Sequence, residues 1–269
     1  SAVDRIEQAV SLGEKITVYG DYDCDGVTAT ALLYSLLRDM GAEVDYYIPS
    51  RETEGYGLNQ GALKKIAESG TRLIVTVDNG ISAVAEAEYA YSLGMELVIT
   101  DHHQIPDTLP RAQAIVNPHL QDGELAFTDL AGVGVAFKLA AALYGDTDDI
   151  LYQYADLAAI GTIADIMPLT DENRSIVKTG IRRIQDAPRP GIAALLKAAG
   201  LSKKEIASSD IAFSVCPRIN ATGRMEHAAK AVELLVCSDP QKADFTAEQL
   251  NINNTHRQEI EQEICEDVI

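Results

Sequence analysis

The sequence has little of what marks a secreted, membrane-spanning or thiolate-metal protein. Its four cysteines, Cys24, Cys216, Cys237 and Cys265, are scattered over 269 residues without paired spacing, a pattern that argues against a disulfide framework or a zinc site. No apolar run approaches the roughly 20 residues of a membrane helix. The start, SAVDRIEQAV, lacks the basic and apolar segments of a signal peptide. We therefore expect a soluble protein of the cytoplasm with reduced thiols.

Basic residues are also scarce. Lys and Arg number 22 against 41 Asp and Glu, so the formal net charge is −19. Nucleic acids normally bind to a basic footprint, and the overall charge therefore argues against a nucleic-acid substrate. Bound divalent ions would offset only part of this charge. Local basic clusters can still bind phosphate, so the objection stays open.

What the sequence does contain is a regular alternation of strand and helix patterns in residues 1–130. The run at 73–77 is continuously apolar, which is typical of a strand buried on both faces. The pattern predicts an α/β fold in which helices flank a parallel Rossmann-like sheet. The expected strands cover residues 16–19, 44–49, 73–77, 97–100 and 114–116, and the expected helices cover 26–40, 58–68 and 81–93.

Two further regions follow this α/β core. Residues 131–238 are expected to form a mostly helical remainder of the same domain, with helices at 133–144, 150–164, 173–185, 191–199 and 227–236. The first two are rich in alanine and apolar residues, and we expect them to pack against the sheet. Residues 239–269 are polar, contain no glycine and have few apolar positions for a core of their own. They are expected to form a connecting helix to a C-terminal domain that lies outside this chain.

Acids and histidines follow three of the expected strands, at the point where each ends. Asp21, Asp23 and Asp25 follow the first strand, Asp78 follows the third, and residues 101–103, Asp-His-His, follow the fourth. In an extended chain, residues i, i+2 and i+4 lie on one side, so the first three acids should converge. Parallel sheets form their sites at the carboxyl ends of the strands. A solvated acidic turn would explain one such strand end, whereas three favour a metal site.

The types of donor indicate which metal such a site would hold. Carboxylates with one or two imidazoles suit Mg²⁺ or Mn²⁺ better than zinc. Asp165, at the end of an expected helix, would add a further carboxylate. Two ions about 3.5–4 Å apart can share a bridging carboxylate and activate a water for in-line attack on phosphorus. Asp101 is expected to orient His102, and His103 is either a substrate-phosphate contact or a surface histidine.

Four motifs, in this order and spacing, resemble the DHH phosphoesterase superfamily: GDYDCDG at 20–26, VDNG at 77–80, TDHH at 100–103 and GTIADIMPL at 161–169. Within that superfamily, EGYGLN at 54–59 and CPRINATGRM at 216–225 are similar to the RecJ family of bacterial exonucleases. The resemblance covers nearly the whole chain. It implies the fold already expected, with two divalent ions, Mn²⁺ or Mg²⁺, as cofactors.

The resemblance also implies a ligand set. It gives the metal-ligand role to Asp23, Asp25, Asp78, His102 and Asp165, with Asp78 as the bridge between the two ions. Asp21 belongs to the same motif and is either a ligand or a close neighbour.

Two positions leave this ligand set open. Some relatives have a histidine four residues before Asp23, where this chain has Tyr19. One ion must therefore find another ligand, such as Asp21 or water. Asp156 remains an alternative to Asp165 as the last ligand.

Substrate contacts are expected from basic and aromatic residues of other motifs. Arg218, Asn220 and Arg224 lie in one short segment, and guanidinium groups match phosphate oxygens in a bidentate way. The resemblance assigns them to the DNA backbone or to the 5′-terminal phosphate, beside His103. The alternative is that these arginines pair with surface acids. Arg51 and Arg174 are weaker candidates, and Tyr56 either stacks on a base or packs.

The function implied is that of a metal-dependent 5′→3′ exonuclease that releases 5′-mononucleotides from single-stranded DNA in repair and recombination. Catalysis is assigned to Asp78, Asp101 and His103. Single-stranded DNA is the expected partner, with a single-strand-binding protein and a helicase beside it and no membrane. One alternative is a phosphodiesterase for short oligonucleotides, cyclic dinucleotides or pyrophosphate, which the negative charge favours. The other is a non-catalytic binding module, against which the intact ligand positions argue.

Overall fold

A parallel sheet of five strands forms the centre of the molecule, as the sequence predicts. The structure, a computed structural model, describes residues 1–120, 127–201, 205–225 and 228–268, the side chains of 224, 225, 267 and 268 excepted. All neighbouring strands pair in parallel, in the order β2-β1-β3-β4-β5. The strands are β1 (Ile16–Tyr19), β2 (Val44–Tyr47), β3 (Leu73–Val77), β4 (Glu96–Thr100) and β5 (Ala114–Val116).

The sheet is buried on both faces because its strands carry apolar side chains in both directions. In β3, Leu73, Val75 and Val77 belong to one core cluster, whereas Ile74 belongs to the other. This alternation is the period of two expected of a strand. The continuous apolar run of β3 therefore serves two cores at once, as its composition predicts.

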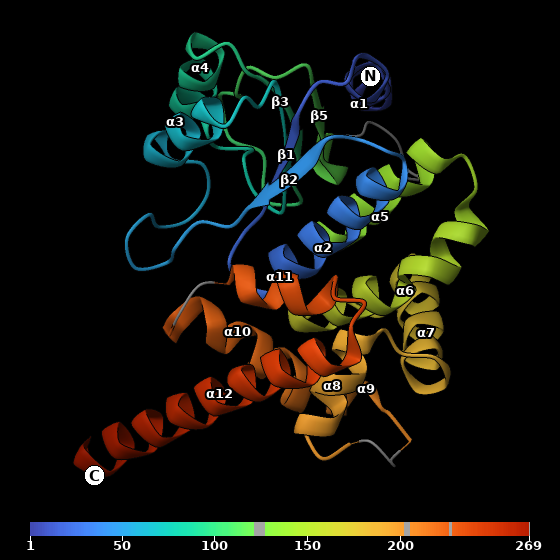
Figure 1. The fold of residues 1–269 in the computed structure, drawn as a ribbon, viewed down its shortest axis with the longest axis vertical. Helices are drawn as coiled ribbons and strands as arrows, with labels where there is room; N and C mark the ends of the chain where they lie inside the picture. Colours follow the sequence, from blue (N-terminus) through green and yellow to red (C-terminus); the bar gives the residue numbers. More distant parts are fainter. Residues whose placement is uncertain (121–126, 202–204, 226–227, 269) are drawn as a thin grey trace.

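Helices cover both faces of the sheet (Figure 1). On one face lie α2 (Cys24–Asp39) and α5 (Gly132–Tyr144), and on the other α3 (Gln60–Glu68) and α4 (Val84–Ser92). A further helix, α1 (Ala2–Leu12), packs on α5 and β5 and was not expected from the sequence. Its start is fixed by a capping box between Ser1 and Asp4.

The helical remainder packs on the α2 side of the sheet. Of the two apolar helices expected on the sheet, α5 contacts β3 and β4, while α6 packs on α2, α5 and α7. The CPRINATGRM segment is itself a helix, preceded by a π-helical turn. The elements here are η1 (Pro118–Leu120), α6 (Thr147–Ala164), α7 (Asp171–Asp186), α8 (Pro190–Ala198), α9 (Ser208–Asp210), η2 (Ile211–Val215), α10 (Cys216–Met225) and α11 (Ala229–Leu235).

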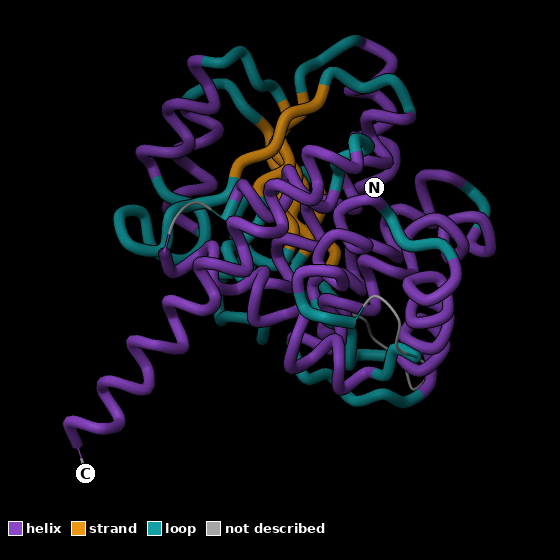
Figure 2. Tube along the Cα trace, turned by 60° about the horizontal axis from the view of Figure 1, so that its bottom comes forward, coloured by secondary structure: helices purple, strands orange, loops and turns teal. Residues whose placement is uncertain are grey.

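The last helix, α12 (Pro240–Val268), is 29 residues long and leaves the body of the molecule (Figures 1 and 2). Its first turns pack on α8, α10 and α11 through buried Ala243, Ala247 and Leu250. Farther along, Ile252 and Ile264 are exposed. This shape fits the expected connecting helix. Among the described residues, no helix has the length and apolar character needed to cross a membrane.

Candidate metal centre

The order of the strands favours a crevice at the end of the sheet where the carboxyl ends of the strands lie. The chain passes from β1 outward to β2 and from β3 outward to β4, so the loops after β1 and β3 diverge. Crevices of doubly wound sheets form at such a reversal, beyond the carboxyl ends of the strands. Asp21 follows β1, Asp78 follows β3 and Asp101 follows β4. The three acidic strand ends therefore meet as expected.

The first acidic motif reaches this crevice by a different backbone path from the one expected. Asp21, Asp23 and Asp25 do not continue β1 as an extended chain, because α2 begins at Cys24. Asp23 is its N-cap, and its side chain accepts a hydrogen bond from the Gly26 amide at 2.9 Å. Asp25 lies in the first helical turn. Helix geometry, and not strand alternation, separates Asp23 from Asp25.

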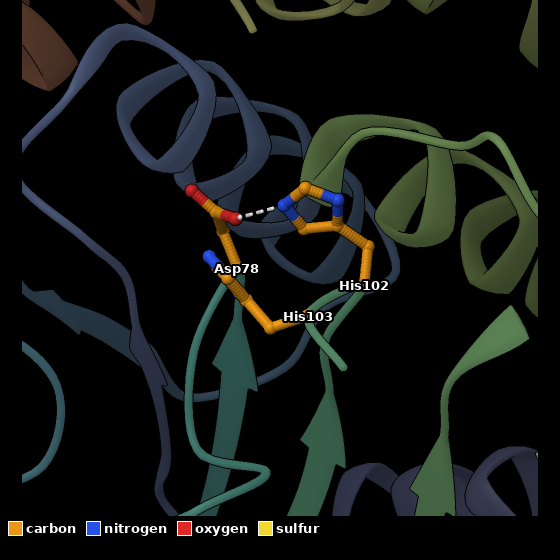
Figure 3. Close-up of side chains that lie close together, drawn as sticks. All are labelled: Asp78, His102 and His103. Atoms are coloured by element: carbon orange, nitrogen blue, oxygen red, sulfur yellow. Dashed lines mark ion pairs between the residues drawn. The ribbon is translucent and has the colours of Figure 1, made fainter. Parts of the chain in front are cut away.

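Three overlapping groups of ligand atoms result, and Asp78 belongs to two of them. Within each group the ligand atoms lie within 4.8 Å of one another, and the groups are Asp21, Asp23 and Asp78; Asp78, His102 and His103; and Asp25, His102 and Asp165. Figure 3 shows Asp78 facing the ring of His102 across the ends of their strands. Asp78 Oδ1 lies 3.1 Å from His102 Nε2.

His102 Nε2 is farther from the carboxylates of Asp165 and Asp25. It lies 3.8 Å from Asp165 Oδ2 and 4.0 Å from Asp25 Oδ2. These two distances exceed a normal hydrogen bond. They suit atoms arranged around a common ion at about 2.1 Å from each ligand.

Backbone details hold the two buried aspartates in place. Asp78 has φ 62°, a left-handed conformation that is uncommon for a residue other than glycine. A Cβ added at Gly132 would lie 2.4 Å from Asp78 Cβ, so only glycine fits there. The amides of Gly132 and Val133 donate to the two carboxylate oxygens of Asp25 at 2.6 and 2.9 Å. The start of α5 is thus part of the site, and its signal in the sequence is the glycine before an apolar helix.

The buried carboxylates lack a matching positive charge. Asp21, Asp25 and Asp78 are each no more than 3% exposed, and among the described residues none forms an ion pair with Lys or Arg. Burial and the charge of Asp23 raise the pKa of Asp21 to about 7. Burial and neighbouring carboxylates hold the pKa of Asp25 and of Asp78 well above the ordinary value.

Two of these buried oxygens also accept no hydrogen bond from the described residues, Asp21 Oδ1 and Asp78 Oδ1. Buried polar atoms normally have a partner. A bound cation would supply both the partner and the charge that these carboxylates lack. Oxygen-rich donors with one or two imidazoles fit Mg²⁺ or Mn²⁺.

Asp101 orients a histidine, but the structure pairs it with His103 and not with His102. Its Oδ1 lies 2.7 Å from His103 Nδ1 and also accepts the His102 and His103 amides. Burial opposes ionisation of Asp101, yet these hydrogen bonds and that from Ile81 hold its pKa below the ordinary value. The hydrogen bond with Asp101 in turn raises the pKa of His103. His103 is 47% exposed and remains free to meet a substrate.

The structure separates Asp156 from Asp165. Asp156 is fully buried in α6, where Arg189 Nε lies 2.9 Å and Arg183 Nε 3.4 Å from its Oδ2. Its carboxylate is therefore already neutralised. Asp165 caps the end of α6 beside His102. Of the two, Asp165 is the one whose carboxylate lies in a group that could hold a metal ion.

A hollow of about 330 Å³ opens beside Asp21 and Asp23. Its lining includes Arg51, Tyr56 and Asn220, three of the residues expected to contact substrate. Arg51 lies over the ring of Tyr22 at 5.4 Å. The side chain of Asn220 accepts the Cys24 amide at 2.8 Å and so ties α10 to the start of α2.

Two aromatic and basic candidates are already engaged by protein groups. The Tyr56 hydroxyl donates to the Asp78 carbonyl at 3.2 Å and lies 3.3 Å from His103 Nδ1. The guanidinium of Arg218 donates to Asn251 at 3.0 Å and to the Ser214 carbonyl at 2.6 Å, which ties α10 to α12. The side chain of Arg224 lies outside the described part. Phosphate contacts by Arg218 and Arg224 stay predictions.

Comparisons with known proteins identify the family. Residues 15–162 match the model of the DHH family, N-terminal domain. The chain is 46% identical over 268 residues to the single-stranded-DNA-specific exonuclease RecJ of Bacillus subtilis, covering 100% of this chain and 34% of that protein. It is 42% identical to the protein of the same name from Escherichia coli, covering 97% and 48%. The chain thus spans between a third and a half of these relatives.

Solved structures agree with the sequence matches. A crystal structure of exonuclease RecJ bound to manganese superimposes with a TM-score of 0.89 and 37% identity, covering 99% of this chain and 68% of that one. RecJ from Thermus thermophilus in complex with Mn²⁺ gives 0.87 and 36%, covering 99% and 39%. This chain therefore belongs to the DHH family and, within it, to the RecJ group.

Proposed function

We propose that the chain carries the catalytic centre of a metal-dependent 5′→3′ exonuclease that releases 5′-mononucleotides from single-stranded DNA. One observation carries the proposal most directly. Asp78 belongs to two of the three groups of ligand atoms, and its carboxylate is buried without a Lys or Arg among the described residues to neutralise it. Support for the substrate comes from the relatives, whose names describe single-stranded-DNA-specific exonucleases.

Two divalent ions, Mn²⁺ or Mg²⁺, fit these groups. Asp21 and Asp23 would hold one ion, and Asp25, His102 and Asp165 the other, with Asp78 between them. Ions bound there polarise the phosphate and lower the pKa of water at the scissile bond. The α5 amides hold the carboxylate of Asp25, and the left-handed backbone conformation of Asp78 directs its side chain. Together they keep the ligand atoms close to one another.

Other side chains position the substrate. Asp101 holds the His103 ring by Nδ1, so the rest of this half-exposed ring can contact a phosphate oxygen. The hydrogen bond with Asp101 raises the pKa of His103, which favours the cationic form of the ring and with it the binding of a phosphate anion. Arg51 and Tyr56 line the adjacent hollow, which is the proposed place of the 5′-terminal nucleotide.

Single-stranded DNA is the proposed partner, together with a helicase that unwinds duplex DNA and a single-strand-binding protein. We also propose a cytoplasmic location. All four cysteines are unpaired, which agrees with a reducing compartment.

The test compares substrates on one protein preparation. The chain, incubated with Mn²⁺, is given a 5′-phosphorylated single strand, the same strand in duplex, a dinucleotide, a cyclic dinucleotide and pyrophosphate. We expect stepwise release of 5′-mononucleotides from the single strand, and none in chelator. Faster turnover of the dinucleotides or of pyrophosphate than of the long strand would instead favour a small-substrate phosphodiesterase.

A further inference from the structure

Directly after Asp165 in the chain, the surface carries unusually exposed apolar side chains. Ile166 is 88% exposed and has φ 57°, a strained conformation for a β-branched residue. Phe213, on the π-helical turn η2, is 82% exposed. A hollow of about 340 Å³ lies between them, with Leu169 and Ser208 in its wall. This apolar surface begins one residue from a candidate metal ligand.

The hollow continues into a second one along α7. Leu169 and Ser208 line both, and the second, of about 290 Å³, is also lined by Ile181, Arg174 and Lys178. The two hollows together form what we call the α7 groove, which has an apolar floor and a basic rim. It extends from Ile166, the residue after Asp165, to the middle of α7.

The basic rim is unusual in this acidic protein. Arg174 and Lys178 are exposed, lie one helical turn apart, and are followed at the same spacing by exposed Arg182. None of the three forms an ion pair with any residue that the structure describes, although acids outnumber bases 41 to 22. By contrast, Arg183 on the neighbouring face of α7 pairs with Asp156. The cations along the groove are therefore available to an anionic ligand.

We propose that the α7 groove binds single-stranded nucleic acid next to the nucleotide held at the metal centre. Bases would lie against Ile166, Leu169 and Phe213, and phosphates would meet Arg174 and Lys178. Apolar platforms for bases beside a basic track for the backbone are how proteins hold single strands without reading sequence. The proposal rests on the proposed function for its substrate class, and it supplies the local basic surface that a charge of −19 otherwise leaves missing.

Charge argues for this occupant over a protein segment. An apolar peptide seated on the floor would bury Arg174 and Lys178 without neutralising them, at a desolvation cost. A phosphodiester backbone brings one negative charge for every base that stacks. The groove thus matches both halves of a nucleotide.

The first experiment measures binding alone. Binding of a labelled twelve-nucleotide oligothymidylate is measured by fluorescence anisotropy at several salt concentrations. Chelator is present, so that no cleavage occurs. The variant Arg174→Gln/Lys178→Gln is compared with Lys64→Gln/Arg72→Gln, which removes the same charge at exposed positions away from the groove. We expect the groove variant to bind more weakly, with a slope of log affinity against log salt that is shallower by about 1.4, since each phosphate contact on a single strand contributes about 0.7.

The second experiment addresses the floor. Phe213→Ala should weaken binding of the twelve-nucleotide strand by about tenfold, as expected for one lost base–aromatic contact. Phe245→Ala, an exposed phenylalanine on α12, is the matched control and should bind as the wild type does. Because Phe213 is on the surface, its loss should leave the unfolding temperature in place.

The outcomes separate this proposal from the proposed function. If the groove variants bind as their controls do while the wild-type chain degrades single strands, the groove proposal is overturned and the function stands. If the groove variants lose binding but the wild type cleaves no strand with Mn²⁺, the groove stands and the exonuclease function fails. A Phe213→Ala change in oligomeric state, with unchanged binding, would make this face a protein interface and overturn the groove.

Discussion

Two buried aspartate sites in this chain are alike in depth and opposite in charge balance. Asp156 is fully buried, and its carboxylate meets Arg189 and Arg183. Asp78 is 3% exposed, and its nearest charge partner is an imidazole, with Asp21 and Asp23 close by. Buried charges in proteins are normally paired or coordinate a metal ion. The first site is therefore complete within the protein, while the second is complete only with a cation.

The same contrast extends to the hydrogen bonds. In Asp156, Oδ1 accepts the Leu157 amide at 2.9 Å and Oδ2 accepts from Arg189, so both oxygens are used. In Asp78, Oδ1 accepts no hydrogen bond in the described part of the chain. The carboxylate of Asp156 is thus fully engaged by protein groups, whereas the bare carboxylate of Asp78 is available to the proposed metal ions. Substitutions at the two sites test that difference, and the largest effect is expected at the bare one.

Removing the bare carboxylate should abolish activity and spare the fold. In Asp78→Ala two of the three groups of ligand atoms lose a member, and we expect cleavage of a single strand with Mn²⁺ to fall by at least about a thousandfold. Thermal unfolding in chelator should stay at or above the wild-type temperature, because a source of repulsion is gone. Asp107→Ala, which alters an exposed acid, is the control. Cleavage retained by Asp78→Ala would refute the bridging role.

Removing the paired carboxylate should have the opposite outcome. Asp156→Asn leaves two partly buried arginines without their partner, and we expect unfolding free energy to fall by about 3 kcal/mol. Urea unfolding measures this loss. The folded fraction should keep its Mn²⁺-dependent cleavage, since Asp156 lies outside the ligand groups. A loss of activity larger than the loss of folded protein would mean that Asp156 belongs to the site after all.

The sequence predicted that the acidic strand ends meet, because a chain that alternates strand and helix places the carboxyl ends of its parallel strands at the same end of the sheet. That reasoning placed Asp78, His102 and Asp21 close to one another from the residues alone. It described the path through Asp21–Asp25 incorrectly, since alternation was taken to continue where a helix begins. An N-cap aspartate and a strand-end aspartate look the same in the sequence.

The sequence left the choice between Asp156 and Asp165 open for a similar reason. Both belong to one apolar helical segment, and only tertiary packing shows that Arg183 and Arg189 approach the first. The pairing of Asp101 with His103 was likewise missed because adjacent histidines differ only in side-chain direction. The α5 amides that donate to Asp25 lie more than 100 residues away from it in the sequence, so no local pattern predicts these hydrogen bonds.

The bare site should also make the metal-free protein sensitive to pH. The pKa of Asp21 is raised to about 7 in the folded state, so its stability contribution is fully present below the unfolded value near 4 and is lost as pH rises through 7. In chelator, unfolding free energy should fall with rising pH by up to about 1.4 kcal/mol per pH unit for this group. Asp21→Asn should flatten the profile, and Mn²⁺ should remove the fall in the wild type. Equal slopes in chelator for wild type and Asp21→Asn would contradict the raised pKa.

The smallest effect is expected at Tyr56. Its hydrogen bond shows that the two aspartates are held in place through different groups. Asp156 is fixed through its carboxylate, whereas at Asp78 the Tyr56 hydroxyl holds the main-chain carbonyl and leaves the carboxylate free. Tyr56→Phe removes one hydrogen bond of about 1 kcal/mol, so we expect kcat to fall about fivefold with KM little changed. Tyr56→Ala also removes the ring, and a rise in KM in that variant alone would assign base stacking to it. If Tyr56→Phe raises KM instead, the hydroxyl contacts the substrate and does not position Asp78.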